Sequence, residues 1–270
     1  MSKEEQNMYQ TLIASIRQSI LDYEREKHLQ KIWKAPLAAL VSVSDPGIAL
    51  LPKAVSETHL MPADVLPGAK SIISFFIPFD ESIITSNLHG DLASREWAEA
   101  YILTNDMIRR IGSGLETVLE TAGYHAGKIP ATHNFDEERL ISDWSHRHIA
   151  YIAGLGSFGI NNMLITDKGC CGRFGSLVTD LPLPDPADPG GNAAKTKTVQ
   201  ERCLNKRKGS CGVCQKKCPA GAYAADGTFD PKRCYNQCLK NAELFRDIGL
   251  ADVCGKCLVG LPCSTMTPAP

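Results

Sequence analysis

The run Cys211-Gly-Val-Cys214-Gln-Lys-Lys-Cys218-Pro219 carries the most specific pattern in this sequence. Bacterial iron–sulfur clusters are held on C-x2-C-x2-C-x3-C-P, and the last three cysteines and the proline of that pattern are present here. Two thiolates separated by two residues reach adjacent irons of one cluster from a tight turn, whereas the cysteine before the proline ligates a second cluster. Lys208 occupies the place of the first cysteine, so Cys203 is the candidate that replaces it.

A second group of cysteines follows downstream. Such a group is required if Cys218, the cysteine before the proline, ligates a second cluster. Cys234 is followed by Cys254-Gly-Lys-Cys257-Leu-Val-Gly-Leu-Pro-Cys263, whose last spacing is two residues longer than the usual form. Two four-iron clusters need eight thiolates. The eight candidate metal ligands are Cys203, Cys211, Cys214, Cys218, Cys234, Cys254, Cys257 and Cys263.

If the last cysteine of each motif ligates the cluster of the other motif, these candidates divide into two sets. One cluster would have Cys203, Cys211, Cys214 and Cys263, and the other would have Cys218, Cys234, Cys254 and Cys257. Cys238 is an alternative to Cys234, and we favour Cys234. Zinc bound by four thiolates is the alternative metal for C-x2-C pairs, but the Cys-Pro ending and the near-doubling of the pattern favour iron–sulfur clusters. A three-iron cluster on an incomplete ligand set stays open.

Composition limits the class of protein. The chain has 270 residues with 29 basic and 30 acidic side chains, so its net charge of −1 gives no general attraction to nucleic acid or anionic membranes. No apolar run is long enough to span a membrane and the N-terminus has no secretory signal, so we expect a cytoplasmic protein. In that compartment disulfides are rare, and clustered cysteines more often hold metal.

Two cysteines precede the metal-binding pattern. Of the eleven cysteines, nine lie between Cys203 and Cys263, and the others are Cys170 and Cys171. Adjacent cysteines point in different directions and make poor partners in one site. We therefore expect Cys170 and Cys171 to be buried, unreactive thiols.

The crowding of cysteines also predicts the domain organisation. Residues 181–191 contain four prolines and two glycines, which neither a helix nor a strand interior accepts, so residues 181–200 are interpreted as a linker. The linker separates an α/β domain over residues 1–180 from a small two-cluster, ferredoxin-like domain over residues 201–270. The fold class expected for the whole chain is α+β.

Hydrophobic periodicity predicts the elements of the first domain. Residues 71–77 form an apolar run typical of a buried strand, and residues 174–179 read as a second strand. An apolar stripe from Trp97 to Val118 predicts a long helix that stops at Gly123. A shorter helix is expected over about residues 137–150.

The segment Gly154-Leu-Gly156-Ser-Phe-Gly159 matches G-x-G-x-x-G, yet we reject a dinucleotide site. Such a loop must follow a strand and open a helix, whereas here the expected helix precedes it and Gly169 arrives before a crossover helix could form. The glycines still indicate that the backbone closely approaches something, either another segment or a flat ligand.

Basic residues flank the first cysteine motif, with only Glu201 opposing them. They are Lys195, Lys197, Arg202, Lys206, Arg207, Lys208, Lys216 and Lys217. One interpretation is a solvated face that offsets the negative charge of a cluster. The other is a docking patch for an acidic redox partner or for RNA phosphate.

Four segments together resemble the epoxyqueuosine reductase family. They are Leu66-Pro-Gly-Ala-Lys-Ser-Ile-Ile, Ile149-Ala-Tyr-Ile-Ala-Gly-Leu-Gly-Ser-Phe-Gly-Ile-Asn161, Gly175-Ser-Leu-Val-Thr-Asp-Leu-Pro-Leu-Pro and the paired cysteine motifs. The resemblance covers roughly residues 60–80 and 145–265 in the same order. That family contains oxidoreductases of tRNA-nucleoside modification and is related to the corrinoid-dependent reductive dehalogenases.

The resemblance implies a cobalamin-binding domain fused to a two-cluster domain. Electrons from a donor such as ferredoxin or flavodoxin would enter through the clusters and reduce the cobalt of the corrinoid, which then acts on the substrate. A large planar corrin suits a wall of glycine backbone, so the resemblance makes Gly154, Gly156, Gly159 and Asn161 candidates for its lining.

The sequence departs from this family at the proton donor. The family places an acidic residue in an Asp-Ser-Ala-Pro context ahead of the glycine segment, and that context is absent here. Asp136 and Asp143 compete for the catalytic acid role. His133, His146 and His148 are further candidates to donate protons or bind metal, because histidine titrates near neutral pH.

Three functions are compatible with these features. We favour an iron–sulfur oxidoreductase that reduces an organic substrate, either tRNA or a small molecule, because the folded part ahead of the clusters is larger than an electron carrier needs. The alternative is a non-catalytic electron-transfer or activator protein that serves a redox partner. A weaker third candidate is an RNA-binding module that uses the basic residues.

Overall fold

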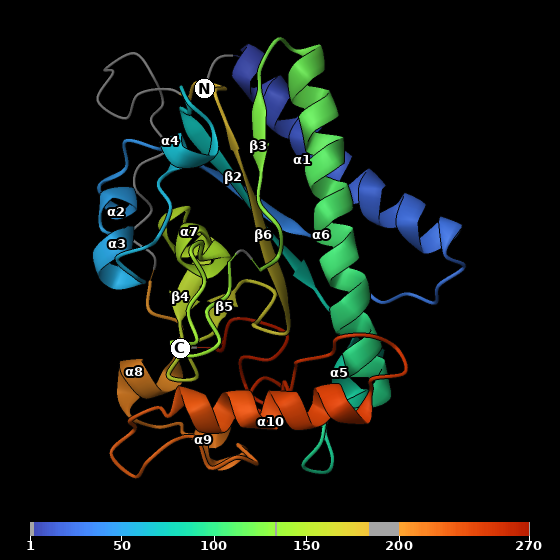
Figure 1. Ribbon diagram of the computed structural model, residues 1–270, viewed down its shortest axis with the longest axis vertical. Coiled ribbons are helices and arrows are strands. Elements are labelled where there is room, and N and C mark those ends of the chain that lie inside the picture. The colour runs from blue at the N-terminus through green and yellow to red at the C-terminus, as the bar shows by residue number, and fades with distance from the viewer. Residues whose placement is uncertain (1–2, 133, 184–199, 270) are drawn as a thin grey trace.

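A four-stranded antiparallel sheet organises the first part of the chain (Figure 1). The computed structural model describes residues 3–132, 134–183 and 200–269, and its side chains from residue 7 onward. The strand order is β1 (Leu37–Ser42), β2 (Ser71–Pro78), β6 (Gly172–Thr179) and β3 (Ala126–Lys128). The two strands expected from the sequence are therefore present, and they pair with each other at the centre of the sheet.

Strand β2 is buried along its whole length because helices cover both faces of the sheet. Ile73, Phe75 and Ile77 pack with helices α1 (Lys3–Glu26) and α6 (Arg95–Thr121). Ile72 and Phe76 point to the opposite face, where α7 (His146–Ile152) and the short helices α2 (Pro46–Ala49), α3 (Leu51–Ala54) and α4 (Pro62–Val65) lie (Figure 1). This alternation is the period of two expected of a strand.

The long helix begins and ends where its capping residues stand. Ser94 Oγ accepts a hydrogen bond from the Trp97 amide at 3.1 Å and so caps the start of α6. The helix ends at Thr121, and Gly123 follows with a φ of +82°, which a glycine adopts without strain. The predicted helix and its end at Gly123 are confirmed.

The expected helix over residues 137–150 is wrong in its first half. Ser145 caps the helix through its hydroxyl, so α7 starts only at His146. Ahead of it, Asp136 Oδ1 accepts hydrogen bonds from the amides of Glu138 and Arg139 at 2.9 Å and closes a turn, which a bridge from Asp136 to Ile141 continues. The local hydrogen bonds of an aspartate and a serine overrode the apolar pattern.

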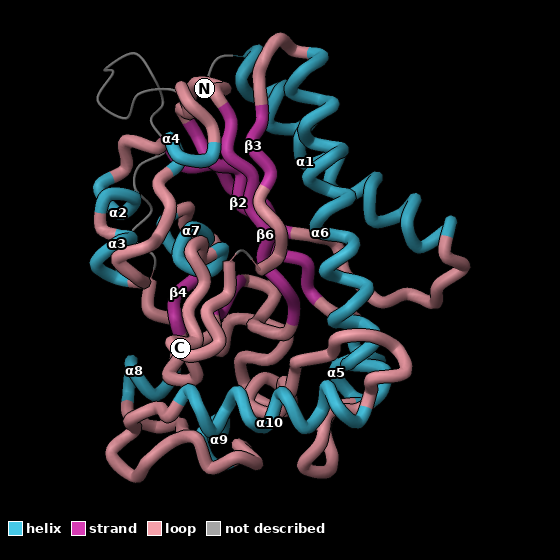
Figure 2. Tube along the Cα trace, in the orientation of Figure 1, coloured by secondary structure: helices cyan, strands magenta, loops and turns pink. Residues whose placement is uncertain are grey.

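The cysteine-rich part is mostly loop and lies at one end of the sheet (Figure 2). Its described residues contain the helices α8 (Leu204–Lys208), α9 (Val213–Lys216) and α10 (Pro231–Leu244). Most of the expected linker, residues 184–199, lies outside the described residues, as does His133. The described residues have the mixed helix and sheet composition predicted for an α+β fold, and the ferredoxin-like arrangement stays a prediction.

The two parts of the chain pack directly against each other. Asn87, which follows the short helix α5 (Glu81–Ser86), donates from its amide nitrogen to the Cys254 carbonyl at 3.0 Å. Gly255 lies so close to the Trp97 ring that a Cβ there would overlap the indole. The cysteine-rich part is therefore held in a defined position on the sheet domain.

In the described part of the chain, no helix combines the length and the apolar character needed to cross a membrane.

Candidate functional site

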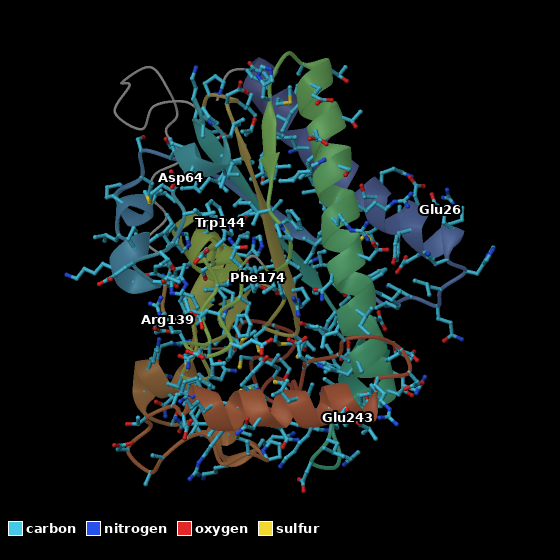
Figure 3. The ribbon with its side chains drawn as sticks, viewed as in Figure 1. Glu26, Asp64, Arg139, Trp144, Phe174 and Glu243 are labelled. Atoms are coloured by element: carbon cyan, nitrogen blue, oxygen red, sulfur yellow. The ribbon has the colours of Figure 1, made fainter. Side chains whose placement is uncertain are left out.

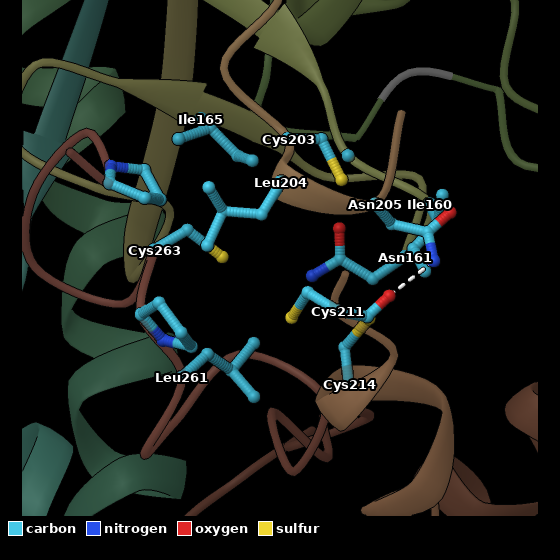
Figure 4. Close-up of a pocket in the computed structure, with 13 residues that line it drawn as sticks. Ile160, Asn161, Ile165, Cys203, Leu204, Asn205, Cys211, Cys214, Leu261 and Cys263 are labelled. Atoms are coloured by element: carbon cyan, nitrogen blue, oxygen red, sulfur yellow. Dashed lines mark hydrogen bonds between the residues drawn. The ribbon is translucent and has the colours of Figure 1, made fainter. Parts of the chain in front are cut away.

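The first set of cysteines surrounds one cavity. Cys203, Cys211, Cys214 and Cys263 all line it, and Figure 4 shows their sulfur atoms directed toward a common space. The four residues come from different segments: the N-cap of α8, the loop before α9, the first turn of α9 and the C-terminal loop. Apolar side chains, among them Ile165 and Leu261, complete the walls. The structure thus brings together the four cysteines that the sequence predicts as ligands of one cluster.

The environment of this cavity disfavours free thiolates. The pKa of the Cys214 thiol is raised to about 11, first by burial and then by the neighbouring Cys263, Cys203 and Cys211. Four thiolates in so small a space repel one another unless a cation lies between them. Iron would supply that charge and deprotonate its ligands, so the residues present fit a four-iron cluster.

The second set of cysteines also gathers in one place. The pKa of the Cys254 thiol is raised to about 11, first by burial and then by the neighbouring Cys234 and Cys218. The pKa of the Cys257 thiol is likewise raised, by burial first and then by Cys234, Cys254 and Cys218. Cys218 follows α9, Cys234 lies in the first turn of α10, and the C-terminal loop supplies the other two. These four residues fit a second cluster on the same grounds.

Cys238 lies one helical turn after Cys234 on α10, and their thiols hydrogen-bond each other. That bond lowers the pKa of Cys234 to about 7 and raises that of Cys238. Cys234 is a neighbour of both Cys254 and Cys257, as a ligand of the same cluster must be. Cys254 is a neighbour of Cys238 as well, so the choice of Cys234 over Cys238 stays a prediction.

Within the described residues, no three histidine, cysteine, aspartate or glutamate side chains converge on a point where one metal ion could bind. In a four-iron cluster each thiolate binds its own iron, so the ligands surround a space instead of meeting at a point.

The glycine segment packs against protein. Strands β4 (Gly156–Phe158) and β5 (Leu164–Thr166) form a hairpin in which a Cβ on Gly156 would overlap the Ile165 carbonyl. A Cβ on Gly159 would lie 2.6 Å from Asn161 Oδ1, and both residues line the first cysteine cavity. Asn161 donates from Nδ2 to the Cys257 carbonyl at 2.9 Å.

The close approaches in this segment have partners within the protein. Of the two alternatives that the glycines left open, another segment accounts for the close approach at Gly156. Gly154, with a φ of +82°, forms the turn that ends α7. The assignment of these residues to a corrinoid lining stays a prediction.

The two candidate acids line one cavity on the sheet domain. Asp136 and Asp143 face it together with Thr58, Phe135 and Arg139. Thr58 Oγ1 donates a hydrogen bond to Asp143 Oδ1 at 2.8 Å, whereas Asp136 is engaged by the turn described above. A small molecule bound in this cavity would lie beside both carboxylates.

Two of the candidate histidines have structural partners. His146 is buried, and its ring nitrogens lie 2.8 Å from Ser176 Oγ and from the Pro130 carbonyl. Trp144, labelled in Figure 3, donates from Nε1 to the same serine at 2.9 Å, so the start of α7 is held against β6. His148 packs its ring on Phe158 with the centroids 4.8 Å apart.

Sequence reasoning missed His59. Its ring stacks on Trp144 with the centroids 5.4 Å apart, and its Nε2 accepts a hydrogen bond from the Ser145 amide at 3.0 Å. Burial lowers its pKa, and the nearby Asp143 raises it in part. A single histidine in an unpatterned segment gives no signal, because its partners come from a segment more than eighty residues away.

Sequence reasoning also missed two neighbouring arginines, Arg147 and Arg173, of which Arg147 lies near the second set of cysteines. Arg147 donates to the Asn162 carbonyl at 2.6 Å, and Cys234 and Cys257 lie near enough to favour its charged form. Burial is the larger effect and lowers the pKa of Arg147. Arg173 lies over the Tyr101 ring at 4.2 Å from the centroid. Arg147 therefore brings a positive charge next to the second set of thiols.

The basic residues of the first motif divide into two groups. Arg202 pairs with Asp167 at 3.0 Å, Lys206 donates to the Phe158 carbonyl at 2.6 Å, and Lys217 donates to the Val259 carbonyl at 3.0 Å, so these three hold neighbouring segments together. Lys208 and Lys216, like Lys206, are exposed on the surface, and Arg207 is half-buried. Lys195 and Lys197 lie outside the described residues, and the docking patch stays a prediction.

The arrangement around His148 predicts a loss of stability in acid. The pKa of His148 is lowered from 6.5 to about 4, first by burial and then by Arg147 and His59. Between these values the unfolded chain binds the proton before the folded chain does, so stability is lost as the pH falls from about 6.5 toward 4. His148→Gln should flatten the pH dependence of the midpoint of urea unfolding in this range.

His89→Gln is the matched control, because His89 is exposed. This variant should keep the wild-type pH dependence. An equal slope for His148→Gln and wild type would show that His148 does not titrate in this way.

Comparisons with known proteins agree with this arrangement. No family model matches the chain. It is 27% identical over 176 residues to epoxyqueuosine reductase of Vibrio cholerae, which covers 64% of this chain and 42% of that protein. It is 24% identical over 188 residues to epoxyqueuosine reductase of Bacillus cereus, covering 66% and 42%. The chain thus spans about 42% of the length of these curated relatives.

Solved structures show the same fold. Epoxyqueuosine reductase from Streptococcus thermophilus superposes with a TM-score of 0.52 at 18% identity, over 93% of this chain and 68% of that one. The catabolic reductive dehalogenase NpRdhA superposes with a TM-score of 0.55 at 15% identity, over 86% of this chain and 30% of that one. The resemblance to the epoxyqueuosine reductases that the motifs predicted is confirmed in sequence and in fold.

Proposed function

We propose that this protein is an iron–sulfur oxidoreductase that passes single electrons through two four-iron clusters to an organic substrate. The observation that carries the proposal is the gathering of eight thiols into two sets of four, as the motif spacing predicted. The similarity to epoxyqueuosine reductases supports a redox function.

The two sets are close enough to act in series. Cys214 of the first set contributes to the raised pKa of Cys257 in the second, and α9 joins Cys214 to Cys218 directly. Lys208 and Lys216 lie on the surface beside the first set, where an acidic electron donor such as ferredoxin or flavodoxin would dock. Electrons would then enter at the first cluster and leave from the second.

The substrate site is best supported at the cavity that contains Asp136 and Asp143. Tyr235, one residue after Cys234 on α10, packs on Phe135 with the ring centroids 5.6 Å apart, so this loop lies next to the helix of the second cluster. An epoxide, as the relatives' name implies, would accept two electrons and two protons, with an alkene and water as products. Asp143 or Asp136, which line the same cavity, would supply a proton.

The substrate itself follows only from the relatives. Their name suggests a modified nucleoside of tRNA, and a small molecule is the alternative. The cavity at Asp136 is lined by charged, aromatic and aliphatic side chains, which suits a polar ring compound in either case.

A corrinoid is not included in this electron path. The resemblance implies cobalamin, but the glycine segment nominated for it packs against Ile165 and against the first cysteine cavity. When bound, a corrinoid would supply a low-valent cobalt nucleophile. No residue of this chain can be assigned to hold it from the present arrangement.

A non-catalytic electron-transfer or activator protein is the second candidate function. It is favoured by Asp136, whose carboxylate is already engaged by two backbone hydrogen bonds of its own turn. In that case the sheet domain would position the clusters for a redox partner.

Iron analysis tests the central proposal. Protein purified without oxygen should contain about eight irons and eight acid-labile sulfides per chain. Cys214→Ser should remove most of the visible charge-transfer absorbance of the first cluster, because it deletes a buried ligand. Cys171→Ser, at an equally buried cysteine outside both sets, should leave that absorbance unchanged. Zinc without acid-labile sulfide would exclude the proposal.

Titration with cobalamin tests the exclusion of a corrinoid. Because the nominated glycine segment is filled by protein, we expect no change in the visible spectrum of hydroxocobalamin and no heat of binding. Stoichiometric binding with a shifted spectrum would return the corrinoid to the electron path. The experiment needs the iron-loaded protein, with free cobalamin in buffer as the reference.

Arg147 should set the reduction potential of the second cluster. A nearby positive charge stabilises the more negative, reduced state of a cluster, so Arg147→Gln should lower one of the two midpoint potentials by tens of millivolts. An EPR-monitored redox titration measures both potentials. Arg147→Lys should retain most of the wild-type value, and Arg246→Gln, at an exposed arginine paired with Glu243, should change neither potential. A loss of potential at both clusters in Arg147→Gln would contradict the assignment.

A further inference from the structure

Cys170 and Cys171, expected to be unreactive thiols, lie against the last cysteine of the second motif. The Cys170 amide donates to the Cys263 carbonyl at 3.0 Å and to the Ser264 carbonyl at 3.2 Å. The Cys171 amide donates to the same Ser264 carbonyl at 3.1 Å. The segment that opens β6 is therefore hydrogen-bonded to the backbone of a candidate ligand of the first cluster.

Gly169 permits this close approach. It has a φ of +76°, and a Cβ at this position would overlap the Ser264 carbonyl. Only glycine combines that backbone conformation with such a short distance between these two segments of the chain. The sequence Gly169-Cys170 thus places a cysteine directly behind Cys263.

The two adjacent cysteines differ in their neighbours. The thiol of Cys170 lies next to the thiols of both Cys171 and Cys263, and its Sγ is 4.0 Å from the Leu258 carbonyl. The thiol of Cys171 donates to the same carbonyl at 3.2 Å. Both residues are fully buried, so neither thiol is in contact with solvent. Of the two thiols, that of Cys170 is the neighbour of the Cys263 thiol.

We propose that Cys170 is a fifth thiol of the first iron–sulfur centre and can replace Cys263 as the ligand of its iron. This inference rests on the proposed iron–sulfur function. In the exchange, the Cys170 sulfur loses its proton and bonds to iron, while the bond from iron to the Cys263 sulfur breaks and that sulfur takes up a proton. No electron is gained or lost.

The stretched spacing of the second motif is consistent with a ligand that can be exchanged. Cys263 follows Cys257 by six positions, so five residues of loop separate it from the nearest other cysteine of its motif. The remaining ligands of its cluster, Cys203, Cys211 and Cys214, belong to other segments. Cys170, by contrast, is fixed at the beginning of a central strand. An iron bound by Cys170 would be attached directly to the sheet domain.

Alanine variants test the proposal, because alanine supplies no atom that can bind iron. In oxygen-free preparations, Cys263→Ala should keep about eight irons per chain, with Cys170 in place of the lost ligand. The double variant Cys170→Ala/Cys263→Ala should lose at least one iron and show the EPR signal of an oxidised three-iron cluster. Cys171→Ala/Cys263→Ala is the matched control and should behave as Cys263→Ala alone.

The outcomes separate this inference from the proposed function. Wild-type protein without iron–sulfur clusters would overturn both. Two clusters in wild type, with Cys263→Ala already as depleted in iron as the double variant, would overturn the role of Cys170 alone. Should Cys263→Ala fail to fold, Cys263→Ser preserves the volume of the side chain. Its iron–sulfur stretching frequencies should then show four thiolates at the first cluster, and a mixed thiolate and alkoxide set would overturn the proposal.

Discussion

The two residues inside one C-x2-C pair, Gly255 and Lys256, pack tightly against the sheet domain. Gly255 abuts the Trp97 ring, and Lys256 is buried and donates from Nζ to the Asn87 and His89 carbonyls at 2.9 and 2.7 Å. A buried ammonium group requires such partners, since an unpaired one is strongly destabilising. Burial lowers the pKa of Lys256, and the neighbouring Cys254 opposes that shift. The orientation of the thiols therefore depends on a lysine that is committed to the other part of the chain.

The sheet domain also holds the backbone of cysteines in both sets through hydrogen bonds from its polar groups. Asn161 holds the Cys257 carbonyl, Asn87 holds the Cys254 carbonyl and the Cys170 amide holds the Cys263 carbonyl. Each bond joins a loop that lacks regular structure to a hairpin, helix end or strand. Clusters bound by these thiols, as proposed, would meet a wall that includes Arg147, and hydrogen bonds and charges of this kind set the potentials of clusters. The sheet domain would then contribute to redox chemistry even where it touches no substrate.

The sequence predicted those features that depend on residues close together in the chain. The buried run of β2, the stripe of α6 with its end at Gly123 and the division of the cysteines all follow from spacing. The start of α7 was misjudged because the capping hydroxyl of Ser145 outweighed an apolar pattern. His59 and Arg147 gave no signal, since their roles arise from contacts between distant segments. For the glycine segment, the spacing predicted that the backbone closely approaches another group. Only the fold shows that this group is the Ile165 carbonyl, which lies against Gly156.

The loop between Cys257 and Cys263 joins three segments of the chain. It closes on itself through Ser264, whose Oγ donates to the Leu258 carbonyl at 2.5 Å and accepts from the Leu261 amide at 2.8 Å. Lys217 from the first motif donates to the Val259 carbonyl, and the Cys171 thiol donates to the Leu258 carbonyl. The carbonyls of two neighbouring loop residues therefore hold the first motif and the segment before β6 against the second motif. This is also the point at which Cys170 meets Cys263.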